Sequence, residues 1–441
     1  MAKDEVLPKL RDGLRMEQFS PSLDDSGQPT RETIGLLRAM RAGFHEKHPS
    51  KEEIRRTAES FQKDSIGFIA VYDDAFHAAE EFSYDEPYPI STFGHYEKSF
   101  NVGGPELIPA HLITEVTVAA THRRQGILTA MMRASLDSAV ADGRPVALLT
   151  ASESVIYGRF GFGIATRSAK YELNSRHGVA FKSSPVGSVV DVDPSKIGDV
   201  SASIFARFHA ATPGSVDRQS SYREYITGAW GDDITLPNKA LRAILYRSES
   251  GQPEGFATYV FNGWGWKPPT VTVRNFVAAS DDAERELWRH LANFDLIEKV
   301  IWSKAPLDTA LFHAIADSES LSTTAVGHDL WVRVLDVPRV LGSRTWVRDG
   351  EFTLSVGDRW GYAAGLYVVS VRDGVATVSR SSDESATADM SMDVSALGSL
   401  ILGEASVSQL VQAGVASASR SLVELDSLWA TLRRPFCNTG F

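Results

Sequence analysis

Apolar residues follow helix-like and strand-like spacings in alternation over the first part of the chain. Residues 31–47 carry them at the spacing of an amphipathic helix, and residues 49–62 do the same. Ser50 and Glu53 stand three residues apart at the start of the second helix, which is the spacing of a capping box. Three further apolar runs are predicted to be strands: 65–73, 90–102 and 112–118. The first part therefore combines helices and strands.

The third strand leads into a polar turn, and the turn leads into a further helix. Apolar residues after Gly126 have the 3.6-residue period of an amphipathic helix, which ends at the helix breakers of residues 142–145. An apolar run over 146–152 predicts the next strand. A strand, turn, helix and strand in this order favour an α/β architecture.

The same order returns in the middle of the chain. Strands are predicted over 254–261 and 269–279, a capped amphipathic helix over 280–295 and another strand over 299–305. The second turn differs in charge, because the first copy reads THRRQG and the second reads SDDAER. Acidic residues suit a helix N-terminus but repel a phosphate there. We therefore interpret the second unit as a structural copy that has lost its cofactor.

The last third of the chain has a different pattern. Residues 351–380 are rich in strands, with turns at Gly357-Asp358 and Asp373-Gly374. Three segments are predicted to be helical: 392–406, 406–414 and 419–434. The strand predicted over 329–337 could belong to this part or return to an earlier one. These patterns predict domains over residues 1–165, 166–328 and 329–441.

Composition narrows the range of partners. The chain has 45 basic and 56 acidic residues, which give a net charge of −11. It therefore lacks the basic surface that is typical of a nucleic-acid-binding protein. The negative charge favours a cationic or amine substrate, and the alternative is an acidic surface with no such partner. Its one cysteine, Cys437, excludes an internal disulfide and gives no zinc spacing, so no metal is expected. No run approaches the roughly 18 apolar residues of a membrane span, and no signal peptide is evident, so we expect a cytoplasmic protein without a membrane span.

The turn before the first amphipathic helix has the chemistry of a phosphate site. A helix N-terminus presents free backbone N–H groups and the positive end of the helix dipole. Gly126 lets a ligand approach the backbone, and Arg123 and Arg124 add charge-assisted donors. Neither GxGxxG nor GxxxxGK[ST] is present, so a Rossmann or P-loop site is excluded. The alternative is an ordinary solvated turn.

A second candidate follows the strand at 146–152. The segment 150–163 reads TASESVIYGRFGFG and contains Tyr157, a tyrosine of the exposed type, beside three closely spaced glycines. A phenol with a pKa of about 10 is a suitable proton donor to a leaving thiolate, whose conjugate acid has a pKa of about 8.5. The alternative is a packed tyrosine whose hydroxyl bonds to a carbonyl.

Together these two stretches resemble the GNAT superfamily of acetyltransferases, and within it the Eis (enhanced intracellular survival) family. The superfamily pattern is [Q/R]-x-x-G-x-[G/A], and Arg123, Gly126 and Leu128 occupy its places. Leucine at the last place departs from the superfamily and matches the Eis branch. The YGRFGFG run is the more specific signal, and the resemblance covers the whole layout: a GNAT domain, a degenerate GNAT domain and a sterol-carrier-like C-terminal domain. The fold class implied is α/β (α+β).

This resemblance implies an acetyl-CoA-dependent N-acetyltransferase that acts on primary amines, namely aminoglycosides at several positions and lysine side chains, and that forms a homohexamer. It implies Tyr157 as general acid and the terminal carboxylate of Phe441 as base, in place of a frayed chain end. The family often has an acidic residue where this chain has Gly440. The cofactor contacts implied are Val116, Thr117, Val118, Arg124, Gln125, Gly126, Ile127, Leu128, Thr129, Ser152 and Glu153. The alternatives are a protein lysine acetyltransferase without drug activity and a lipid- or CoA-binding module.

Overall fold

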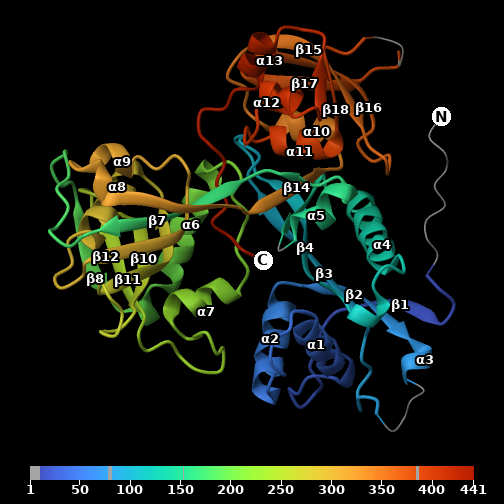
Figure 1. Cartoon of the computed structure of the whole chain (residues 1–441), viewed down its shortest axis with the longest axis horizontal. Helices are drawn as coiled ribbons and strands as arrows, with labels where there is room; N and C mark the ends of the chain where they lie inside the picture. Colours follow the sequence, from blue (N-terminus) through green and yellow to red (C-terminus); the bar gives the residue numbers. More distant parts are fainter. Residues whose placement is uncertain (1–9, 78–81, 152, 384–386) are drawn as a thin grey trace. The chain divides into compact units, whose positions relative to one another are not determined.

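The computed structural model describes residues 10–77, 82–151, 153–383 and 387–441 (Figure 1). The chain forms two compact units. The first unit comprises residues 1–98, 109–150 and 441, and the second comprises 99–108 and 151–440.

A mixed sheet forms the core of the first unit. Its strands, in spatial order, are β1 (Leu14–Phe19), β2 (Gly67–Asp73), β3 (Ser91–Phe100), β4 (Ile108–Val118) and β5 (Val146–Thr150). Strands β1 and β2 pair antiparallel, as do β2 and β3, whereas β4 and β5 run parallel. The parallel pair requires a crossover, and a helix provides it.

Three helices of the first unit lie where the sequence predicts them, and the short α3 was not predicted. The helices of this unit are α1 (Arg31–Gly43), α2 (Lys51–Lys63), the short α3 (Asp74–His77) and the crossover helix α4 (Ile127–Ala141). The capping box of α2 is confirmed, because the Ser50 side chain accepts from the N–H of Glu53 and the Glu53 side chain accepts from the N–H of Ser50. Apolar side chains of α4, including Met131, Met132 and Leu136, are fully buried.

A seven-stranded sheet forms the core of the middle part of the chain, within the second unit. Its spatial order is β13 (Leu321–His328), β7 (Arg167–Asn174), β12 (Lys299–Ala305), β11 (Thr270–Ala278), β10 (Pro253–Phe261), β9 (Arg242–Arg247) and β8 (Ser188–Val192). Helix α8 (Asp281–Leu291) connects β11 to β12, which pair in parallel. Helix α8 packs in one apolar cluster with Ala257, and α6 (Gly198–Ala211) packs in another with Phe256. Neighbouring residues of one strand point to opposite faces, so helices cover both faces of this sheet.

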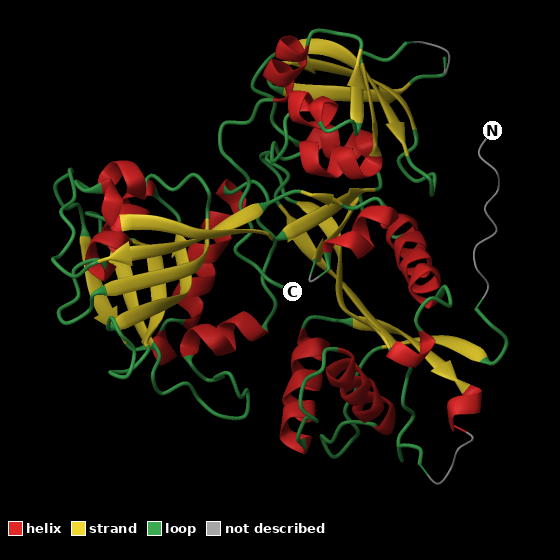
Figure 2. Cartoon of the chain, viewed as in Figure 1, coloured by secondary structure: helices red, strands yellow, loops and turns green. Residues whose placement is uncertain are grey.

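The remainder of the second unit builds a small sheet with short helices packed beside it (Figure 2). The strand order is β17 (Val375–Arg380), β16 (Gly365–Arg372), β15 (Gly350–Gly357), β18 (Met390–Asp393) and β19 (Ala416–Ala418). Its helices are α10 (Val337–Ser343), α11 (Val394–Leu400), α12 (Val407–Gln412) and α13 (Leu422–Trp429). Strand β14 (Leu330–Val334) pairs antiparallel with β6 (Gly163–Ile164), so the strand at 329–337 returns to residues at the end of the predicted first domain.

Two helix predictions in this part are wrong at their ends. The first two residues of the helix predicted over 392–406 belong to β18, in which Met390 and Met392 are buried and the residue between them is not. The helix α11 begins only after Asp393, whose side chain accepts a hydrogen bond from the N–H of Ser395. The helix predicted over 419–434 ends at Trp429.

Within the described part of the chain, every helix is too short or too polar to cross a membrane.

Candidate active site

The turn between β4 and α4 leaves the start of a helix without a side-chain cap. Gly126 is the N-cap residue of α4 and has a left-handed backbone with a φ of 80°. No side chain among the described residues accepts a hydrogen bond at this cap. The first N–H groups of α4, at Ile127, Leu128 and Thr129, therefore lack the partner that a Ser or Asp N-cap would supply. This is the local geometry of an anion site.

The basic residues of the turn are available to a ligand. Arg123 and Arg124 are exposed, and the Nε of Arg123 lies 3.5 Å from the carbonyl oxygen of Val118. The backbone of Arg124 is left-handed, with a φ of 63°. The Oε1 atom of Gln125 is buried, and no donor to it exists among the described residues. A pyrophosphate bearing negative charge fits the two guanidinium groups and the uncapped N–H groups of α4.

His122 anchors the turn, and the sequence did not single it out. Its side chain is buried, its Nε2 lies 3.0 Å from Oδ2 of Asp73 at the end of β2, and its Nδ1 lies 2.8 Å from the hydroxyl of Thr121. The two contacts fix the imidazole on both sides. A lone histidine in a polar turn carries no sequence signal for this role.

Strands β4 and β5 pair over only part of their length. Their parallel register runs from Ala110 opposite Val146 to Ile113 opposite Leu149, and β4 then continues to Val118. The side chain of Thr117 is buried, and its hydroxyl lies 2.7 Å from that of Thr92. Of the strand residues predicted to contact the cofactor, Thr117 can therefore offer its backbone only.

Glu115, within β4, has an unusual backbone conformation and an unusual carboxyl pKa. Its φ is 52°, in the left-handed region. Burial raises the pKa of its carboxyl to about 7, against a smaller lowering by Arg41 and with a further rise caused by Glu46. A carboxylate with a pKa near neutrality suits a general base. The sequence pattern of a strand contains no signal for such a shift.

Phe441 lies at the end of β5, within the first unit. The hydroxyl of Thr150 donates a hydrogen bond to the main-chain oxygen of Phe441. The Phe441 ring meets the Tyr96 ring edge to face, with 6.4 Å between the ring centroids. The residue is thus held at both its backbone and its side chain.

The residues before Phe441 are held by the second unit. Thr439 is fully buried, and its hydroxyl donates to the carbonyl oxygen of Val216 at 2.7 Å. The amide of Asn438 donates to the carbonyl oxygen of Phe276 at 2.8 Å, and the N–H of Gly440 donates to the hydroxyl of Tyr222 at 2.7 Å. A frayed segment would have none of these contacts, so residues 438–440 form an ordered tail.

Tyr157 ends the short helix α5 (Ser154–Tyr157), within the second unit. It is half-buried, so the expectation of an exposed tyrosine is wrong: its ring packs edge to face on Phe162, with 6.3 Å between the centroids. Burial raises the pKa of its phenol, and the charge of Glu153 raises it further. The hydroxyl therefore stays protonated at neutral pH. Glu153 is exposed, and the predicted cofactor contact Ser152 lies outside the described residues.

The glycines after Tyr157 have a packing role. Gly161 has a φ of 82°, and a Cβ there would lie 1.6 Å from Nη1 of Arg333. The Arg333 side chain is buried and donates through Nη2 to both carboxylate oxygens of Asp358, at 2.8 and 3.0 Å. A Cβ on Gly163 would lie 1.9 Å from the carbonyl oxygen of Ser395. The glycines thus let the segment after Tyr157 pack closely against β14 and α11.

We expect Gly161→Ala to lower the free energy of unfolding by about 2–4 kcal/mol, because a left-handed alanine costs about 1–2 kcal/mol and overpacking about 1–3 kcal/mol. Gly158→Ala is the matched control, since Gly158 has helical backbone angles and open space at its Cβ position. Urea denaturation of both variants checks the difference. Equal midpoints for the two would contradict the packing role.

Family models match most of the chain. Residues 31–165 match a GNAT acetyltransferase domain, residues 214–334 match a second GNAT acetyltransferase domain, and residues 337–438 match a sterol carrier protein domain. The predicted fold class, with two GNAT domains and a sterol-carrier-like domain, is confirmed.

Relatives and solved structures agree with these matches. An uncharacterized N-acetyltransferase of Streptomyces avermitilis is 34% identical over 376 residues, which cover 81% of this chain and 87% of that one. The N-acetyltransferase Eis of Mycobacterium tuberculosis is 33% identical over 345 residues, which cover 75% of this chain and 80% of that one. The crystal structure of Eis1 from Mycobacterium abscessus superposes with a TM-score of 0.78 at 25% identity, covering 96% of this chain and 100% of that one.

Proposed function

Because this chain belongs to the Eis family of GNAT N-acetyltransferases, we propose that it transfers the acetyl group of acetyl-CoA to primary amines of aminoglycosides, at several positions, and to lysine side chains. The use of acetyl-CoA and of an amine acceptor is common to GNAT domains. In this chain, the main support for an acetyl-CoA site is the uncapped start of α4 beside two exposed arginines.

In this proposal the first domain holds the donor. The N–H groups of Ile127, Leu128 and Thr129 bind the pyrophosphate, with Arg124 and Gln125 closing around it. The backbone of Val116, Thr117 and Val118 runs along the pantetheine arm, and Glu153 lies near it. Two observations support this placement: β4 extends beyond its pairing with β5, and the first N–H groups of α4 have no side-chain cap.

We expect Arg124→Ala to raise the KM for acetyl-CoA by about tenfold to a hundredfold, because one charge-assisted contact contributes about 1.5–3 kcal/mol. Arg133→Ala is the control, since Arg133 lies on α4 beyond the turn and pairs with Asp137 at 3.0 Å. Steady-state kinetics at a fixed, saturating amine concentration separates the two variants. An unchanged KM in Arg124→Ala would remove the pyrophosphate role.

The proposed chemistry is a direct transfer. Bound acetyl-CoA supplies an activated thioester carbonyl. The Phe441 carboxylate takes a proton from the bound ammonium, a backbone N–H of β4 donates to the developing oxyanion, and Tyr157 donates its proton to the departing sulfur. The carbon–nitrogen bond forms and the carbon–sulfur bond breaks, and the nitrogen then loses its second proton, which restores the Tyr157 phenol, so no covalent enzyme intermediate is needed.

A second candidate for the base deserves comparison because of its pKa. A free α-carboxyl has a pKa of about 3.5 and needs desolvation to serve as a base. Glu115 has a pKa of about 7. We favour Phe441, since Thr150 and Tyr96 hold it at the end of β5, whereas the groups that shift the pKa of Glu115, Arg41 and Glu46, lie on or beside α1.

The acceptor class has its own test. We expect thiol release from acetyl-CoA with kanamycin at a kcat/KM at least tenfold above that with a lysine-containing peptide, since the chain has a net charge of −11 and a polycation gains most from an acidic enzyme. Turnover of the peptide alone would favour a protein lysine acetyltransferase. By the same family resemblance we expect a homohexamer in sedimentation analysis.

A further inference from the structure

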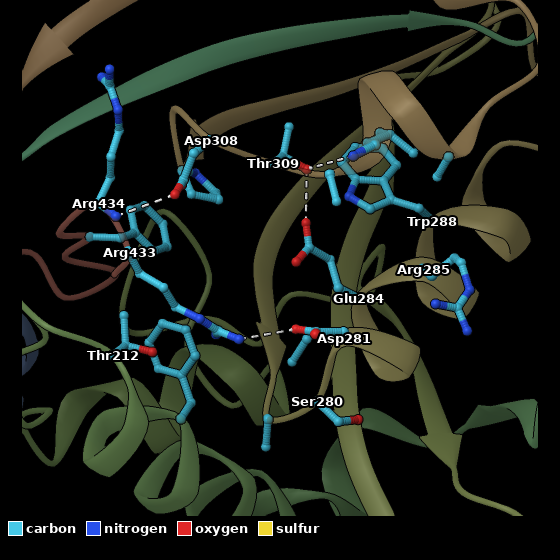
Figure 3. A pocket seen from close by; sticks show the side chains of 18 of the residues that line it. Thr212, Ser280, Asp281, Glu284, Arg285, Trp288, Asp308, Thr309, Arg433 and Arg434 are labelled. Atoms are coloured by element: carbon cyan, nitrogen blue, oxygen red, sulfur yellow. Dashed lines mark hydrogen bonds and ion pairs between the residues drawn. The ribbon is translucent and has the colours of Figure 1, made fainter. Parts of the chain in front are cut away.

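The C-terminal segment 433–440 is bound along the second GNAT domain. At its start, Nη2 of Arg433 lies 3.5 Å from Oδ1 of Asp281, and the backbone N–H of Arg434 donates to the carboxylate of Asp308 at 3.3 Å (Figure 3). Asp281 lies in the first turn of α8, and Asp308 follows β12. Exposed ion pairs of this kind contribute little by themselves. The acidic turn that corresponds to the cofactor turn of the first domain therefore meets the beginning of this segment.

The middle of the C-terminal segment is buried. Cys437 and Thr439 have no exposed surface, and Nζ of Lys304 donates to the carbonyl oxygen of Thr439 at 3.3 Å. The side chains of Asn438 and Thr439 donate to main-chain carbonyl oxygens of the same domain. Buried polar groups with hydrogen-bond partners keep one arrangement, so the segment reaches Gly440 in a fixed position.

Gly440 is the exposed last residue of the segment, and glycine has the freest backbone of all residues. A Cβ at this position would have no atom nearer than Nζ of Lys304, at 3.8 Å. The φ of Gly440 also lies outside the left-handed region. Glycine is therefore required here neither by space nor by a left-handed backbone, and its freedom has to be restrained by contacts.

Two side chains hold the peptide groups on both sides of Gly440. The N–H of Gly440 donates to the hydroxyl of Tyr222 at 2.7 Å, and Nε2 of Gln219 donates to the carbonyl oxygen of Gly440 at 3.2 Å. That carbonyl belongs to the planar peptide group that joins Gly440 to Phe441. Only the two backbone torsions of Phe441 then separate the held peptide group from the terminal carboxylate.

Tyr222 is itself held by an arginine. The guanidinium carbon of Arg218 lies 4.6 Å from the centroid of the Tyr222 ring and 4.1 Å from that of the Phe205 ring. Nη2 of Arg218 donates to Oδ1 of Asn275 at 2.9 Å. Its Nε and Nη1 atoms are buried without a hydrogen-bond partner among the described residues, which is costly for a charged group. The cation–π contact offsets part of this cost and fixes the Tyr222 ring.

We propose that the second GNAT domain positions the terminal carboxylate of Phe441 for proton transfer, with Tyr222 and Gln219 as the positioning residues. This inference rests on the proposed function, in which that carboxylate is the base. Both side chains act through the peptide groups of Gly440. The domain with the acidic turn thus serves the reaction by holding the C-terminus instead of a cofactor.

The double variant Tyr222→Phe, Gln219→Leu tests the proposal, because it removes both contacts with Gly440 and keeps the ring over Arg218. With kanamycin at pH 7 it is expected to lower kcat about tenfold or more and to leave the Kd for acetyl-CoA within about twofold, since a misplacement of about 1 Å can cost about 100-fold. Tyr225→Phe, on the same helix α7 (Ser221–Thr227), is the matched control and should keep the full rate, because the Tyr225 ring packs on Trp230.

The pH dependence separates positioning from a general loss of structure. A misplaced base matters less once the amine has lost its proton to solvent, so the deficit of the double variant should shrink to about threefold or less as the pH approaches the pKa of the amine. A deficit of the same size at every pH, or an unchanged kcat at pH 7, would overturn the proposal. Tyr222→Phe alone should show the same trend with a smaller deficit.

Carboxypeptidase A gives a readout that needs no acetyl transfer, because it releases a C-terminal aromatic residue. It should release Phe441 at least about fivefold faster from the double variant than from the unaltered protein, since restrained chain ends resist proteolysis. Equal rates of release would contradict the restraint of Gly440. Absence of acetyl transfer by the unaltered protein with every amine, together with faster release from the double variant, would reject the proposed function and leave that restraint established.

Discussion

Tyr157→Phe is expected to lower the kcat for acetyl transfer at least about 100-fold while leaving the Kd for acetyl-CoA within about twofold. The change removes one hydroxyl and keeps the ring that packs on Phe162. A positioned general acid contributes about 10²–10⁴-fold to the rate. Stopped-flow measurement of thiol release gives kcat, and calorimetry gives the Kd. Tyr225→Phe, at an exposed position on α7 (Ser221–Thr227), is the matched control.

The pH profile gives this prediction a second readout. Burial and Glu153 raise the pKa of Tyr157 above its usual value of 10.0, so the phenol remains a donor throughout the neutral and mildly alkaline range. No loss of kcat from ionisation of Tyr157 is expected below pH 10. Unchanged turnover in Tyr157→Phe, or a loss confined to acetyl-CoA affinity, would end the assignment of Tyr157 as the acid.

Extension of the chain by a few residues after Phe441 is expected to lower kcat/KM for the amine at least about 100-fold. The extension replaces the carboxylate with an amide, which cannot accept the ammonium proton. Phe441→Ala is the matched control, because it keeps a carboxylate and removes only the ring that contacts Tyr96. Its loss should be smaller than that of the extended chain by tenfold or more.

Glu115→Gln separates the two candidate bases. If Phe441 is the base, this variant keeps most of its activity, and the profile of the unaltered enzyme lacks an acidic limb at pH 7. Glu115 has a pKa of about 7, so a Glu115 base would lose activity as the pH falls through 7 and the carboxyl becomes protonated. Full activity in the extended chain, with loss in Glu115→Gln, would transfer the role to Glu115.

Much of the fold follows from local sequence because its signals are local. The capping box at Ser50 and Glu53, the apolar period after Gly126 and the Ser280 cap each require only neighbouring residues, and each is present in the structure. The start of β18 could not be predicted in the same way. Met390 and Met392 fit a helix or a strand in sequence, and their pairing with Leu354 and Val356 of β15 decides between them.

The residues that hold the candidate site in place do so through contacts between positions far apart in the sequence. His122 is fixed by Asp73, which lies 49 positions earlier, and Gly161 is required by Arg333, far along the chain. The shifted pKa of Glu115 comes first from burial, which only the folded chain creates. Sequence motifs identified the turn and Tyr157, whereas these supporting groups have no motif of their own.

A structure of the protein with coenzyme A tests the central claim most directly. The pyrophosphate is expected within hydrogen-bond distance of the N–H groups of Ile127, Leu128 and Thr129, beside Arg124, with the thiol directed along β4. Coenzyme A bound at the start of α8, or anywhere other than the start of α4, would contradict it.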